Sequence, residues 1–68
     1  MVSHRYDEVL TAAQEAISEV NDVAPVHYDE QGNPEGGTPW WANNKYHETI
    51  AVVWYDEEDQ FHTKPYRP

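Results

Sequence analysis

The fold is decided by residues 46–64, which read YHETIAVVWYDEEDQFHTK. Positions 46–55 are rich in β-branched and aromatic residues, a composition typical of a strand. Four consecutive acids follow at 56–59, and a second short segment with Phe61 and Thr63 then returns. We therefore expect a β-hairpin over about residues 46–64, with the acids in its turn.

A turn centred on Glu57-Glu58 predicts which side chains share a face of this hairpin. Tyr55 would then pair with Gln60, and Trp54 with Phe61. One face would carry Ile50, Val52, Trp54, Phe61 and Thr63. We expect this face to pack on a helix. The other face would carry Ala51, Val53, Tyr55 and His62. It is too apolar for an ordinary solvent-facing sheet, so either Trp40-Trp41 or another molecule should cover it.

The N-terminal part predicts an amphipathic helix over about residues 4–21. Its apolar residues recur at three- and four-residue spacing: Tyr6, Val9, Leu10, Ala13, Ala16, Ile17 and Val20. Ser3 suits the N-cap, and Asp7 and Glu8 suit the positive end of the helix dipole. Pro25 limits any continuation. We expect a single α+β domain over residues 1–68, with this helix packed on a two- to three-stranded antiparallel sheet.

The segment between helix and hairpin is less regular. Val26–Tyr28 is compatible with a short strand, and glycines and prolines predict a flexible loop over about residues 29–39. Trp40-Trp41 then follows, either as a helical turn or as an irregular segment. Two interpretations stay open for this pair. One ring packs in the core while the other lies on the surface, or one ring anchors an interface, where tryptophan is enriched.

Thirteen acids against four bases give the chain a net charge of -9. Such a charge disfavours direct binding of nucleic acid or of an anionic membrane. It favours a basic partner, a cation or a high-salt environment. Glu15 and Glu19 lie one helical turn apart and repel each other. Glu19 and Asp22 also lie at the negative end of the helix dipole. A helix face selected only for stability would carry both acidic and basic residues.

Catalytic and metal chemistry find little support in the sequence. The chain has no cysteine, which excludes disulfides and thiolate metal sites. Neither serine lies in a nucleophile elbow. His27 with Asp29, and His47 with Glu48, lack the spacing of known metal sites, and surface residues explain them better. We expect a non-enzymatic protein that uses no cofactor.

The small size and single-sign charge resemble, in type, small phage-encoded inhibitors of host enzymes or defence complexes. A row of carboxylates could imitate the phosphates of nucleic acid and occupy the basic surface of a nucleic-acid-binding protein. We expect an inhibitor or regulator of this kind. The partner-binding residues would be Glu15, Glu19, Asp22, Trp40, Trp41, Asp56, Glu57, Glu58 and Asp59.

Two alternatives stay open. The protein could be a structural or assembly subunit that forms a homodimer through Ala51, Val53 and Tyr55. It could instead be an acidic protein of a halophile with a metal- or ligand-binding role. The residues for that role would be His27, Asp29, His47 and His62. The longest apolar run, Ile50–Tyr55, is far shorter than the ~20 residues of a membrane span. The N-terminus lacks the apolar stretch of a signal peptide, and we expect a cytoplasmic location.

Overall fold

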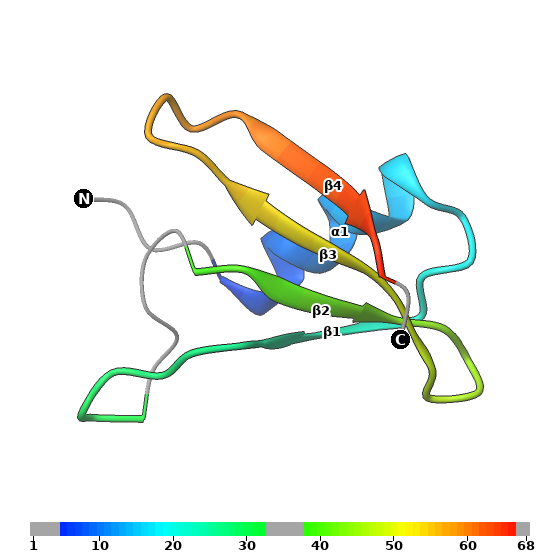
Figure 1. The fold of residues 1–68 in the computed structure, drawn as a ribbon, viewed down its shortest axis with the longest axis horizontal. Helices are drawn as coiled ribbons and strands as arrows, with labels where there is room; N and C mark the ends of the chain where they lie inside the picture. Colours follow the sequence, from blue (N-terminus) through cyan, green and yellow to red (C-terminus); the bar gives the residue numbers. More distant parts are fainter. Residues whose placement is uncertain (1–4, 33–37, 67–68) are drawn as a thin grey trace.

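The computed structural model describes residues 5–32 and 38–66, which form one helix followed by four strands (Figure 1). The elements are α1 (Tyr6–Ala16), β1 (Asp22–Pro25), β2 (Trp40–Asn43), β3 (Thr49–Tyr55) and β4 (Phe61–Pro65). The strands form one antiparallel sheet in the order β1-β2-β3-β4. Helix α1 covers one face of it. The α+β arrangement predicted from the sequence is confirmed, with four strands instead of two to three.

Helix α1 is shorter than its apolar spacing predicts. It ends at Ala16, and Ile17 already has extended dihedrals (φ -137°, ψ 110°). Val20 still joins the core, from a turn in which its N–H donates to the Ile17 carbonyl. A turn can therefore continue a three-residue apolar spacing without a helix. The last helical turn carries no basic residue, so no side chain of that turn offsets the negative end of the dipole. The expected cap Ser3 lies outside the described residues.

Two strands form where the sequence predicted none. Strand β1 begins at Asp22, which we had placed at the end of the helix, and it precedes the short strand expected at Val26–Tyr28. Strand β2 contains both Trp40 and Trp41, which we had expected in a helical or irregular segment. Pro25 lies in β1, at one edge of the sheet. An edge is where a sheet tolerates proline, because no ladder hydrogen bond is lost there.

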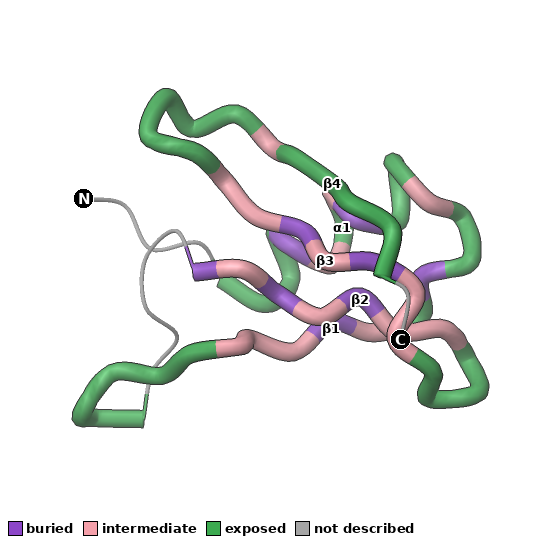
Figure 2. Tube along the Cα trace, in the orientation of Figure 1, coloured by how far each residue is buried: buried purple, intermediate pink, exposed green. Residues whose placement is uncertain are grey.

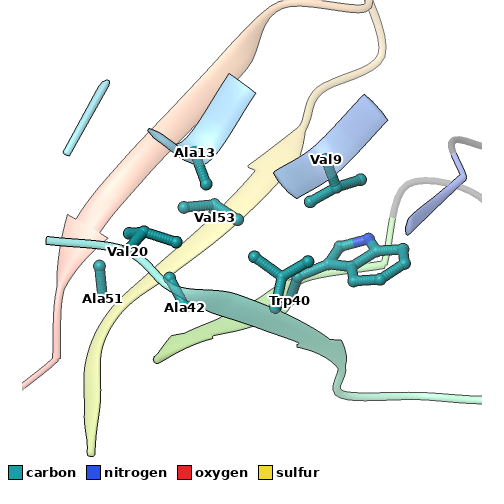
Figure 3. Packing of buried hydrophobic residues seen from close by; sticks show 8 residues of the cluster. Val9, Ala13, Val20, Trp40, Ala42, Ala51 and Val53 are labelled. Atoms are coloured by element: carbon teal, nitrogen blue, oxygen red, sulfur yellow. The ribbon is translucent and has the colours of Figure 1, made fainter. Parts of the chain in front are cut away.

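The core lies between α1 and the sheet (Figure 3). Helix α1 contributes Val9 and Ala13, which point toward the sheet residues Trp40 and Val53. The full buried cluster is Val9, Ala13, Val20, Val23, Trp40, Ala42, Ala51 and Val53. Three of its members are alanines, and small side chains let a helix backbone approach a sheet closely. Trp40 supplies the large ring that fills the remaining volume.

The alternation along β3 corrects the faces expected for the hairpin. Ala51 and Val53 are buried, while Val52 and Trp54 are only partly buried (Figure 2). Ala51 and Val53, which we expected on the face away from the helix, therefore lie under α1, and Val52 and Trp54, which we expected under the helix, lie on the opposite face. The register differs as well: Tyr55 pairs with Phe61, not with Gln60. A one-residue change of register moves every side chain of the partner strand to the other face.

The same alternation removes the dimer surface expected at Ala51, Val53 and Tyr55. Ala51 and Val53 are 1% and 0% exposed and lie in the core. No second molecule can contact them while α1 is in place. Tyr55 is partly buried and packs against the same cluster.

Candidate interaction site

The turn between β3 and β4 is built around Asp56. Its Oδ1 accepts hydrogen bonds from the backbone N–H groups of Glu58 and Gln60, both at 2.9 Å. Its Oδ2 lies 2.7 Å from Nε2 of His62. The hydrogen bond from His62, followed by the bond from the Gln60 backbone, lowers the pKa of Asp56 below its ordinary value. Asp56 therefore stays ionised, and its oxygens are engaged by the turn itself.

The other three acids of this turn are exposed. Asp59 has a positive φ of 64°, a conformation that Asp and Asn adopt more readily than most residues. Its N–H donates to the Asp56 carbonyl at 3.0 Å, which closes the turn. Glu57 and Glu58 lie at the tip of the hairpin. The turn thus presents carboxylates on a backbone that Asp56 holds in shape.

A second group of acids lies on the outer side of α1. A shallow hollow of about 430 Å³ is bordered by Asp7, Glu8, Thr11, Ala12, Glu15 and Tyr55. We call this surface the acidic hollow. Its lining comes from successive turns of α1 and from Tyr55, the last residue of β3. Thr11 is held in place by a hydrogen bond from its hydroxyl to the Asp7 carbonyl, at 2.8 Å.

Tyr55 connects the acidic hollow with the acidic turn. Burial raises the pKa of its phenol, and the negative charges of Glu8 and Asp59 raise it further. Glu8 comes from α1 and Asp59 from the turn after β3, so two acids that are distant in sequence act on one ring. Tyr55 thus borders the helix acids in the acidic hollow and directly precedes the turn acids along the chain.

Sequence reasoning found only part of this surface. It identified Glu15 and the acids at 56–59, but it did not select Glu8 as a site residue and assigned Tyr55 to a dimer face. The available signal was that Asp7, Glu8, Thr11 and Glu15 lie at helical spacing on one side. Nothing local indicated that the end of β3 would lie beside them.

Two predicted site residues lie apart from the acidic hollow. Glu19 borders a different hollow of about 610 Å³, together with Lys45, Tyr46 and Ile50. The carboxylate of Asp22 accepts a hydrogen bond from the hydroxyl of Tyr6. This bond is the main reason that the pKa of Tyr6 is raised, with burial and the charge of Asp22 adding to it. The three helix-side acids expected to act together are thus divided among three environments.

The two tryptophans have different environments. Trp40 is 3% exposed and belongs to the core, so it cannot serve as a partner-binding residue in this fold. Trp41 lies on the opposite face of the sheet and is partly buried. Its ring meets that of Tyr66 edge to face, with centroids 5.6 Å apart. The structure thus places one ring of the pair in the core and leaves the other partly exposed.

The residues considered for a metal do not converge within the described part of the chain. Among residues 5–32 and 38–66, no three histidine or carboxylate side chains form a group that could hold a metal ion. In the same residues, no helix is long and apolar enough to cross a membrane.

No protein-family model, curated protein or solved structure matches the chain.

Proposed function

We propose that this protein is a non-enzymatic inhibitor or regulator that binds a basic surface of a nucleic-acid-binding protein. The contact surface is the acidic hollow together with the exposed acids of the β3–β4 turn. Carboxylates there would pair with lysine and arginine of the partner and steer its approach. A phage-encoded inhibitor acting by mimicry of nucleic acid is one form that such a protein would take.

The observation that carries this proposal is that Tyr55, at the end of β3, borders one hollow together with Asp7, Glu8 and Glu15 of α1. Tyr55 also immediately precedes the turn acids, so carboxylates from α1 and from the hairpin turn lie on two sides of one residue, although they are separated by about fifty positions in the chain. Acids divided between opposite sides of a protein produce two weaker local fields. Acids gathered around one hollow produce a local field that a basic groove can complement.

The spacing of the helix acids fits a partner that binds nucleic acid. Glu8 and Glu15 are separated by about 10 Å along α1, at 1.5 Å per residue. Duplex DNA presents about six phosphate charges over that length. The hollow supplies three carboxylates there, and the adjacent turn supplies more. A groove that accommodates phosphates would therefore meet a partial substitute for them.

The proposal is tested by capture of partners from a cell lysate with the immobilised protein. Binding is compared at about 0.1 M salt, where the Debye length is about 10 Å, and at about 1 M, where it is about 3 Å. We expect nucleic-acid-binding proteins at low salt, displaced by added duplex DNA and lost at high salt. If the acids serve only salt adaptation, no partner is retained and stability rises with salt. That outcome would refute the proposal.

A variant and a charge-matched control locate the surface. The variant E57Q/E58Q/D59N keeps Asp56, because Asp56 holds the turn together. The control D29N/E30Q/E48Q removes the same three charges elsewhere. At about 0.2–1 kcal/mol for each exposed charge pair, we expect the variant to weaken binding about tenfold. We expect the control to bind more nearly like the original protein. Equal weakening would mean that only net charge matters.

A further inference from the structure

The second hollow, of about 610 Å³, lies at the end of the sheet where the chain passes from α1 into β1. It is bordered by residues 17–21 of that connection, by residues 44–46 of the β2–β3 turn, and by Ile50 of β3. The two segments lie side by side (Figure 1), because the N–H of Asn21 donates to the Asn43 carbonyl at 2.7 Å. The volume falls in the range of about 300–1,000 Å³ that is typical of small-molecule sites. We call this surface the mixed hollow.

The inner lining of the mixed hollow is apolar. Val20 is 3% exposed and belongs to the buried cluster. Ile17 and Ile50 are partly buried and pack against that cluster. An apolar ligand that covers the exposed parts of these two isoleucines removes them from water, which favours binding.

The rim of the mixed hollow carries one acid and one base, Glu19 and Lys45. Both residues are exposed. Oε2 of Glu19 accepts a hydrogen bond from the Ser18 hydroxyl at 3.4 Å, and Nζ of Lys45 lies 5.3 Å from the centre of the Tyr46 ring. Neither contact neutralises a charge, so both groups remain able to pair with a ligand. The described residues around the acidic hollow, by contrast, include three carboxylates and no base.

Hydrogen bonds from side chains hold both walls of the mixed hollow. In the β2–β3 turn, Oδ1 of Asn44 accepts from the N–H groups of Tyr46 and Glu48, at 2.9 and 3.0 Å. In the connection after α1, the carbonyl of Val20 accepts a hydrogen bond from Nε2 of Gln14 at 3.3 Å. A ligand therefore meets walls that are already held in place, which lowers the entropic cost of binding.

The charges of the rim select the class of ligand. An anion is repelled by the net charge of -9. A cation meets Lys45 here, whereas it meets only carboxylates in the acidic hollow. A zwitterion has no net charge, so the field of the chain does not repel it. Such a ligand pairs one of its charges with Glu19 and the other with Lys45.

We propose that the mixed hollow binds a small zwitterion with an apolar body, the class to which apolar amino acids and their dipeptides belong. The ammonium of the ligand pairs with Glu19 and its carboxylate with Lys45, while its apolar body lies against Ile17 and Ile50. Because both ion pairs are exposed to solvent, each contributes little, and we expect a dissociation constant of about 1–10 mM. The site shares no bordering residue with the acidic hollow, so it is independent of binding to a basic partner.

The first test follows the amide shifts of the ¹⁵N-labelled full chain while leucine or leucyl-leucine is added to about 50 mM, well above the expected dissociation constant. The two probes differ in the separation of their charges. We expect at least one of them to cause saturable changes at Ile17, Val20, Tyr46 and Ile50. The absence of saturable changes with both probes, or changes confined to other residues, would overturn the proposal.

Three analogues of leucine separate the contributions to binding. Glycine carries both charges without the apolar body and should cause no saturable change. The compounds 4-methylpentanoate and 3-methylbutylamine carry the apolar body with one charge each. Each should bind about threefold to fivefold more weakly than the zwitterion, because one exposed ion pair is lost. If either singly charged analogue binds as tightly as the zwitterion, the assignment of its missing charge is wrong.

Four variants test the two rim residues. Glu19→Gln and Lys45→Gln each remove one rim charge and should weaken binding of the zwitterion about threefold to fivefold. Glu30→Gln and Lys64→Gln make the same changes of charge outside the mixed hollow and should leave binding unchanged. All four positions are exposed, so the variants keep the core intact. Unchanged affinity in both rim variants, or equal weakening in rim and control variants, would contradict the proposal.

Discussion

The two sides of β3 carry similar residues and have different environments. Ala51 and Val53 face α1 and are buried, whereas Val52 and Trp54 face away and are partly exposed. Size and hydrophobicity alone would have placed Trp54 inside. The burial of each residue follows from the side chains that it meets on the neighbouring strand. Ala51 pairs with Ala42, and Val53 with Trp40. The helix packs on the side where small residues leave room for it.

The same two sides differ in charge. The helix side carries the acidic hollow, and Tyr55 there experiences both Glu8 and Asp59. The opposite face of the sheet, which we call the open face, carries His62 and Lys64 beside the partly buried Val52 and Trp54. The carboxylate of Asp56 lies 2.7 Å from the His62 ring. The sheet separates the two surfaces, so the charged contact that we propose for a basic partner lies on the side of α1. The following predictions test this separation.

The largest effect is expected from the tryptophan pair in β2. Trp40→Ala removes a core ring and should cost about 3–5 kcal/mol of unfolding free energy. A domain of this length has roughly 3–10 kcal/mol in total, so this variant should be largely unfolded at moderate temperature. Trp41→Ala loses partial burial and an edge-to-face contact worth about 0.5–1.5 kcal/mol. Urea denaturation followed by circular dichroism measures both. Equal costs would mean that the two sides of β2 are not distinct.

An intermediate effect is expected from enlarging neighbouring side chains in β3. Ala51→Leu forces extra volume between the sheet and α1 and should cost about 1–3 kcal/mol. Val52→Leu changes a side chain on the open face and should stay within about 0.5 kcal/mol, as is usual for surface positions. Thermal unfolding of the two variants at one protein concentration gives the comparison. A stable Ala51→Leu protein would show that α1 does not pack tightly there.

The smallest effect concerns Asp56 and pH. Its pKa is lowered from an ordinary value of 3.8. A carboxylate with a lowered folded-state pKa stabilises the fold above its ordinary pKa, and this contribution is lost as the pH falls through the lowered value. The hairpin turn should therefore loosen below about pH 3.8. In Asp56→Asn the corresponding acid transition should be absent. Amide shifts of Glu58 and Gln60 across a pH titration report it. An unchanged transition in the variant would assign it to another carboxyl group.

The sequence predicted the elements better than their pairing. Periodic apolar spacing located α1, and β-branched residues located β3, because both signals are local. The faces of β3 were assigned wrongly because they depend on β2 and β1, and Trp40-Trp41 was not recognised as a strand. Because the prediction lacked those two strands, it could not indicate which side of β3 the helix would cover. Val20 also continued the apolar spacing beyond the end of α1, because a residue in the following turn can reach the core as well as a helical residue can.

The candidate site was predictable to a similar degree. Composition identified the acids at 56–59 and Glu15 as notable. It could not reveal that Asp56 is engaged by its own turn, since this depends on the position of His62. It also could not bring Glu8 next to Tyr55, because that contact requires α1 to lie beside the end of β3. Charge can be read from a sequence, but the surface on which it gathers is a property of the fold.

The separation of the two sides is tested most directly by mapping amide chemical shifts while a short arginine-rich peptide is added. The experiment uses ¹⁵N-labelled protein at about 0.1 M salt, where charge attraction is only partly screened. The account predicts shift changes at Glu8, Glu15, Tyr55 and the turn 56–59, and none at Trp41, Val52 and Trp54. Changes centred on the open face, or spread evenly over all acids, would contradict it.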